Sequence, residues 1–138
     1  MKSAWPVSIG VLFPVAYAAF SFSVKSIDKQ SLAQKEEEVK VTLAINELPS
    51  ESYFRVAFQP KDGGAYFGYI KNDKSEWVKI GTLSGDCQNY YHLTDTSANE
   101  LTISLIIGGE NEIENGDYLI KGHRYTAGCS YKEGETAV

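Results

Sequence analysis

The feature that most constrains the fold is a recurring alternation of apolar and polar residues in short runs. In residues 39–46, Val39, Val41 and Leu43 fall on one face of an extended chain, and the residues between them fall on the other. This two-residue period is typical of a β-strand with one buried face. Strand patterns return along the rest of the chain. We expect strands at 39–46, 53–59, 65–71, 76–80, 88–93, 100–107 and 117–126.

Turn signals separate these runs at a spacing of roughly ten residues. The segment Lys61-Asp62-Gly63-Gly64 is typical of a tight hairpin, because Asp and Gly readily adopt positive φ. Nine Tyr, six Phe and two Trp also favour strands, since aromatic side chains pack well on a pleated surface. With 138 residues and no pattern of a long helix, we expect one all-β domain, an antiparallel sandwich or barrel.

One short motif favours the sandwich. Gly116 lies two residues before Tyr118, which opens the run 117–126, as in the tyrosine corner of immunoglobulin-like domains. Cys129 follows this tyrosine by eleven residues, whereas an antibody domain has its second cysteine two residues later. We therefore expect an Ig-like or fibronectin-like sandwich of about seven strands, preceded by an N-terminal hydrophobic segment, but no antibody-type domain.

The N-terminal segment has the pattern of an export signal. Lys2 is followed by an apolar stretch at 7–13, and Ala16-Tyr17-Ala18 supplies the small residues that signal peptidase accepts. Residues 1–18 are therefore predicted to be a signal peptide cleaved after Ala18. The alternatives are an uncleaved membrane anchor and an ordinary core segment of a cytosolic protein. The protein is expected to be extracytoplasmic, and to contact a membrane only if this segment is retained.

A further strand is expected directly after the cut. Phe20, Phe22 and Val24 alternate with polar residues, and the charged stretch 28–38 then forms a tether. This strand has two possible partners, the sheet of its own domain or the sheet edge of another copy, which would be donor-strand addition. The expected organisation is a strand and tether at 19–38, followed by a sandwich domain at 39–138.

The two cysteines and the net charge narrow the range of functions that the chain could have. Cys87 and Cys129 lack the spacing of a metal or redox motif, so in an exported chain we expect a disulfide between them. Such a bridge contributes on the order of 3 to 4 kcal/mol to stability by restricting the unfolded chain. The net charge of -5 opposes nucleic acid binding, because an acidic domain repels phosphate.

No pattern of catalytic residues stands out. The chain lacks the zinc-protease, nucleophile-elbow, Walker A and dinucleotide-binding motifs. His92 and His123 each lie in a predicted strand beside tyrosines, which favours a structural role. We expect no catalytic residue and no cofactor, and a small hydrolase is the least favoured function.

Two other groups of residues are candidates for binding. An acidic loop offers oxygen ligands for a weak calcium site, although the EF-hand spacing is absent. The calcium candidates are Glu110, Glu112, Glu114 and Asp117. Exposed aromatic rings on one sheet face would form a platform for sugars or peptides. The platform candidates are Tyr66, Tyr69, Trp77, Tyr90 and Tyr91, with Tyr125 as a further ring.

The strings AYFGYIKNDKSEWVKIG and NGDYLIKGHRYTAG, with Cys87 between them, are similar to a known type of protein module. Over residues 65–128 the chain resembles a β-sandwich module of predicted secreted surface proteins of uncultured bacteria. That module has no assigned activity, so the resemblance implies an extracytoplasmic binding or structural role and supplies no catalytic residues. The expected function is an exported, non-enzymatic surface module that binds a protein, a glycan or further copies of itself. The alternatives are a fibre subunit and a carbohydrate-binding module.

Overall fold

The computed structural model describes residues 19–81, 87–111, 116–129 and 132–137. The predicted signal peptide, at 1–18, therefore lies outside the described residues. Within the described part of the chain, no helix is long and apolar enough to span a bilayer.

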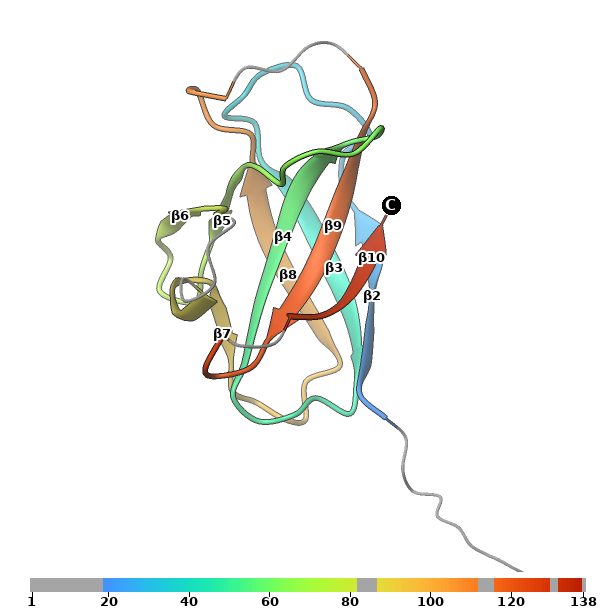
Figure 1. Ribbon diagram of the computed structural model, residues 1–138, viewed down its shortest axis with the longest axis vertical. Coiled ribbons are helices and arrows are strands. Elements are labelled where there is room, and N and C mark those ends of the chain that lie inside the picture. The colour runs from blue at the N-terminus through green and yellow to red at the C-terminus, as the bar shows by residue number, and fades with distance from the viewer. Residues whose placement is uncertain (1–18, 82–86, 112–115, 130–131, 138) are drawn as a thin grey trace, which may run out of the picture.

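The strands form two antiparallel sheets packed face to face (Figure 1). The five-stranded sheet has the order β2-β3-β8-β5-β6, and the four-stranded sheet has the order β10-β9-β4-β7. The strands are β2 Ser21–Ile27, β3 Val39–Asn46, β4 Ser52–Pro60, β5 Tyr69–Lys71, β6 Trp77–Lys79, β7 Tyr91–Leu93, β8 Glu100–Ile106, β9 Tyr118–Tyr125 and β10 Lys132–Ala137. An all-β antiparallel sandwich is thus confirmed. Its assignment to the Ig-like or fibronectin-like type stays a prediction.

The core lies between the sheets and follows from the alternation in the sequence. Val41 pairs with Ile103 across β3 and β8, and both side chains are buried. Phe54 and Val56 of β4 approach them from the other sheet and are also buried. The alternating strands β3, β4 and β8 therefore each contribute their apolar residues to one shared interior.

The strand after Ala18 joins the sheet of its own domain. β2 pairs with β3 in antiparallel register, with an irregularity between Val24 and Ser26. The rings of Phe22 in β2 and of Phe20, directly before it, contact Phe54 of the opposite sheet at centroid distances of 5.6 and 6.4 Å. At this edge β2 lies beside β10 of the other sheet (Figure 1). Exchange of β2 between copies stays a prediction.

The run 65–71 was expected to be one strand, but the strand β5 covers only Tyr69–Lys71. Phe67 bridges to Phe58 in the four-stranded sheet, whereas Ile70 pairs with Leu105 in the other sheet. The chain changes sheets at Gly68, whose φ is +119°. A glycine is required there because an added Cβ would lie 2.9 Å from the carbonyl oxygen of Ile106.

Two further differences concern the second half of the chain. The run 88–93 forms a strand only at β7, because a 3-10 helix at Cys87–Asn89 takes its first residues. β10 was not expected, since KEGETA lacks apolar alternation, and its pairing with β9 is what makes it a strand. The predicted disulfide is confirmed: Cys87 and Cys129 are bonded, with their Cα atoms 5.6 Å apart.

Candidate functional site: a cavity at one end of the sandwich

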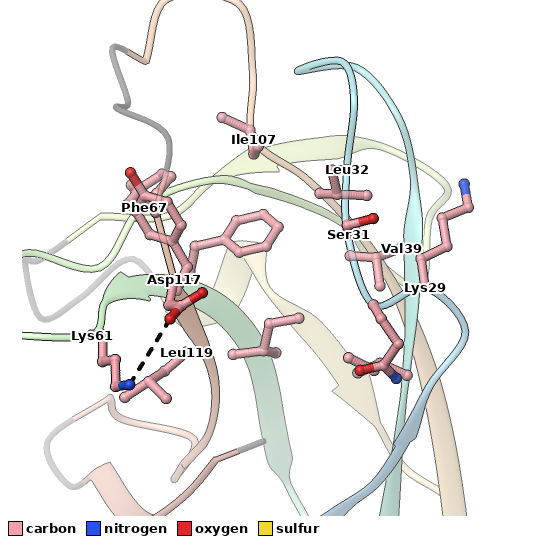
Figure 2. A pocket seen from close by; sticks show the side chains of 15 residues that line it. Lys29, Ser31, Leu32, Val39, Lys61, Phe67, Ile107, Asp117 and Leu119 are labelled. Carbon is pink, nitrogen blue, oxygen red and sulfur yellow. Dashed lines mark ion pairs between the residues drawn. The ribbon is translucent and has the colours of Figure 1, made fainter.

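A cavity of about 470 Å³ opens between the sheets at one end of the sandwich (Figure 2). Its floor is core: Val39, Phe58, Ile107 and Ile120 line it and are buried. The remaining lining residues are partly buried or exposed. They are Ile27, Lys29, Gln30, Ser31, Leu32, Lys61, Phe67, Gly116, Asp117, Tyr118 and Leu119. The cavity is thus mainly apolar, with its polar groups supplied by a few side chains near the surface.

The segment 28–38, expected to be a tether, crosses this end of the sandwich and is anchored at two points. The backbone N–H of Lys40 donates to the Asp28 carboxylate at 2.7 Å. Farther along, the carbonyl oxygen of Lys35 accepts hydrogen bonds from the N–H groups of Ile107 and Gly108, at 3.1 and 2.9 Å. These bonds hold the segment against β3 and the end of β8, so Leu32 contributes to the cavity wall.

The cavity rim carries charges of both signs. The Lys61 amine lies 3.9 Å from the Asp117 carboxylate, and the Lys29 amine lies 3.4 Å from the Glu37 carboxylate. Lys61 and Lys29 stand on opposite sides of the view in Figure 2. The backbone N–H of Ala33 donates to Glu37 at 2.9 Å and, with smaller help from Lys29, holds the pKa of this carboxyl below its usual value. Glu37 is therefore a persistent anionic partner for Lys29.

The predicted aromatic platform divides between the two sheets. Tyr66 and Tyr90 flank the guanidinium of Arg55, at 5.1 and 5.6 Å from ring centroid to Cζ, and Tyr90 is buried. Tyr125 also contacts Arg55 at 5.6 Å. Tyr91 pairs with a core phenylalanine of β4 and packs against the core. These four rings serve packing.

The other two candidate rings share one face. Ile70 is buried and pairs with Val78, so the neighbouring Tyr69 and Trp77 both face away from the core of the five-stranded sheet. Trp77 is 39% exposed, the one large hydrophobic side chain among the described residues that is exposed. The Tyr69 hydroxyl donates to the carboxylate of Glu110.

The predicted calcium ligands are only partly described. Glu112 and Glu114 lie outside the described residues. Glu110 interacts with Tyr69 and with Lys79 at 3.4 Å, while Asp117 faces Lys61. No group of three or more potential metal ligands occurs within the described ranges.

The two histidines lie apart from the cavity lining. His92 stacks on Tyr53 at 4.3 Å, and its Nε2 lies 3.5 Å from the exposed carboxylate of Glu51. His123 is buried and accepts a hydrogen bond from Arg55. A histidine and an acid therefore meet on the surface, at His92 and Glu51, but at a place that the cavity does not include.

Sequence reasoning missed the cavity, because its residues come from four separated stretches of chain. One local signal was present. Leu32 is a leucine within the highly charged run 28–38, and an apolar residue in such a run indicates that one side is covered.

Comparisons with protein-family models, with curated proteins and with solved structures give no match to this chain. The resemblance over residues 65–128 therefore stays a prediction. The functional proposals below depend on the geometry of the site and on the sequence pattern.

Proposed function

We propose that the protein is an exported, non-enzymatic β-sandwich module that binds a small, largely apolar ligand in its end cavity. The observation that carries this proposal is the cavity itself. Its volume of about 470 Å³ falls within the roughly 300–1,000 Å³ of typical small-molecule sites. Such sites are apolar with a few polar groups that orient the ligand, as is the lining here.

The disulfide and the N-terminal pattern support export. Disulfides persist mainly in oxidising compartments, and Cys87 and Cys129 are bonded. A binding role is favoured over catalysis because the cavity lining described above contains neither histidine nor cysteine. Mass spectrometry of the protein from its native host tests export. A mature chain beginning at Ala19, with the disulfide intact, is expected, and a retained residue 1–18 segment in a reduced cytosolic protein would refute export.

Ligand binding is tested by filling the cavity. Leu32→Trp places a larger side chain in the cavity wall, whereas Leu93→Trp makes the same change at a half-buried leucine of β7 that does not line it. Binding of Nile red, an uncharged apolar dye, is measured by fluorescence titration of the full chain and both variants. Leu32→Trp is expected to weaken binding at least about tenfold, the loss that follows when the ligand loses about 1.4 kcal/mol of contacts.

The outcome that would contradict the proposal is equal binding by the two variants and the parent chain. Circular dichroism confirms that each variant keeps its strands. Native mass spectrometry of the purified protein gives an independent result, because a retained ligand appears as a defined added mass that Leu32→Trp removes and Leu93→Trp does not.

The second candidate is glycan binding at the outer face of the five-stranded sheet. The observation in its favour is that Tyr69 and Trp77 face outward together, beside the hydrogen-bonding side chains of Glu110 and Lys79. Sugar rings stack on aromatic faces while their hydroxyls bond to such groups. Affinity electrophoresis in polysaccharide gels tests it: Trp77→Ala should abolish retardation, and Tyr53→Ala on the other sheet should preserve it. Unretarded parent protein would end this candidate.

A further inference from the structure

We infer that the cavity takes an anionic single-chain amphiphile, an alkyl chain ending in a carboxylate as in a fatty acid. This inference rests on the proposed ligand-binding function and adds the chemistry of the ligand. Two features of the cavity carry it: the aliphatic character of the walls and the arrangement of charge at the rim.

The walls suit a hydrocarbon chain. Six of the lining residues are aliphatic, three in the floor and three in the walls: Val39, Ile107 and Ile120, and Ile27, Leu32 and Leu119. A sugar or peptide in this space would leave hydroxyl or amide groups without hydrogen-bond partners, which weakens binding in apolar surroundings. An alkyl chain loses nothing on leaving water there, and each buried methylene strengthens binding about fourfold.

The rim suits a negative head group. Among the described residues, the charged side chains that line the cavity are two amines, Lys29 and Lys61, and one carboxylate, Asp117. Glu37 faces Lys29 from outside the lining at 3.4 Å and Asp117 faces Lys61 at 3.9 Å, so each amine has a carboxylate partner. An anionic head can replace Asp117 as the partner of Lys61, whereas a cationic head would approach the amines of Lys29 and Lys61.

Lys61 is the amine assigned to the head group. Its contact with Asp117 is 3.9 Å long, and the two side chains are 64% and 84% exposed. Exposed pairs of this kind contribute little to stability, so Lys61 can turn to a ligand carboxylate at small cost. Lys29 is less available because Glu37, held by the N–H of Ala33, already faces it.

The experiment compares three ligands with the same chain length and different heads: decanoate, decanol and decyltrimethylammonium. Their affinities for the full-length protein are measured by titration calorimetry. Lys61→Gln is expected to lower the affinity for decanoate about two- to fivefold, which is the range for one exposed charge pair. The affinity for decanol should not change. Asp117→Asn removes the carboxylate that competes for Lys61 and should raise the affinity for decanoate. Lys74→Gln, an exposed lysine outside the cavity, is the matched control.

Salt and chain length give two further readouts. Added salt should weaken decanoate binding and leave decanol binding unchanged, because only the first depends on charge. Affinity should rise from hexanoate to octanoate to decanoate. Decanol binding with equal sensitivity to Lys61→Gln, or decyltrimethylammonium binding more tightly than decanoate, would overturn the anionic assignment alone. Absence of binding by all three ligands would overturn the proposed function as well.

Discussion

The Nε of Arg55 donates a hydrogen bond to the Nδ1 of His123 over 3.2 Å, between directly paired residues of β4 and β9. Arg55 is 3% exposed and His123 is completely buried. Because Nδ1 accepts, the imidazole is neutral in this arrangement. The same guanidinium donates to the carbonyl oxygen of Gly81 at 2.6 Å and to the Tyr90 hydroxyl at 3.2 Å. A second, polar core thus covers the outer face of the four-stranded sheet.

Removing Arg55 should damage this polar core. In Arg55→Ala, the Nδ1 of His123 loses its donor, the Gly81 backbone and the Tyr90 hydroxyl keep only the hydrogen bonds to each other, and a void is left beneath the tyrosines. We expect a loss of about 3 to 5 kcal/mol in the free energy of unfolding, measured by urea denaturation. Tyr90→Phe, which removes one hydroxyl, should cost about 1 kcal/mol. A loss below that of Tyr90→Phe would show that Arg55 is not central to the cluster.

The disulfide should stabilise the fold through the segment that it closes. Cys87 and Cys129 are 42 residues apart, so the bond restricts a long loop of the unfolded chain. Reduction is expected to lower the free energy of unfolding by about 3 to 4 kcal/mol. Thermal unfolding with and without reductant measures the change. The doubly substituted Cys87→Ser, Cys129→Ser protein should match the reduced parent and be insensitive to reductant, and a reductant effect on it would point to another cause.

Gly68 should be intolerant of a side chain. In Gly68→Ala the new Cβ would lie 2.9 Å from the Ile106 carbonyl oxygen, in a backbone with positive φ. We expect a loss of about 2 to 4 kcal/mol in chemical denaturation. Gly63→Ala is the matched control, because Gly63 shares the positive φ but has open space around it, and should cost about 1 kcal/mol. Equal losses in the two variants would exclude a role for the close approach to Ile106.

Deleting residues 19–27 should expose the core beside Phe54. The deletion removes the half-buried apolar side chains of Phe20 and of Phe22, Val24 and Ile27 in β2, and an expected loss of roughly 3 to 6 kcal/mol follows from their burial. A synthetic peptide of residues 19–27 should restore stability when added in excess. If copies exchange this strand, the parent protein should form oligomers that the deleted protein cannot form, as measured by light scattering. Oligomers of the deleted protein would refute strand exchange.

Tyr69 and Glu110 should titrate as a linked pair. The hydrogen bond to the Glu110 carboxylate, with some desolvation, raises the pKa of Tyr69, and the same bond, aided by Lys79, lowers the pKa of Glu110. The Tyr69 contribution to stability is therefore present below the unfolded tyrosine pKa and lost as pH rises through the folded value. The Glu110 contribution is present above the unfolded carboxyl pKa and lost as pH falls through the folded value.

Nuclear magnetic resonance titration of the tyrosine rings measures this linkage. In Glu110→Gln the pKa of Tyr69 should fall toward its ordinary value, while the other tyrosines keep theirs. An unchanged Tyr69 titration in this variant would contradict the assigned cause. Lys79→Gln, which leaves the hydroxyl–carboxylate bond in place, should have the smaller effect on Tyr69.

Four long strands were predictable because their signal is local. In β3 the bounds 39–46 were correct, and in β4, β8 and β9 they were correct to within one residue at each end. Alternation of apolar and polar residues reports which half of a strand is buried, whatever it packs against. The disulfide was also predictable, since two cysteines have one possible intramolecular pairing.

The remaining features depend on contacts between distant parts of the chain. β10 has no apolar alternation, and it forms a strand because its backbone pairs with β9. Arg55 reads as a solvated residue of a strand, but long-range contacts with His123 and Tyr90 bury it. The predicted platform divides between two faces, because Tyr69 and Trp77 share the outer face of the five-stranded sheet, whereas Tyr66, Tyr90 and Tyr125 pack around Arg55 on the other sheet.

The sequence by itself determined that this chain forms β-strands with one buried and one exposed face, because the alternation of apolar and polar residues is local to each strand. Only the tertiary structure decided where the end cavity lies and which side chains line it. Leu32, Lys61 and Ile107 are far apart along the chain, and the packing of two sheets with the segment 28–38 brings them to one opening. Local patterns predict which residues are buried. The residues that they pack against depend on how the whole chain folds.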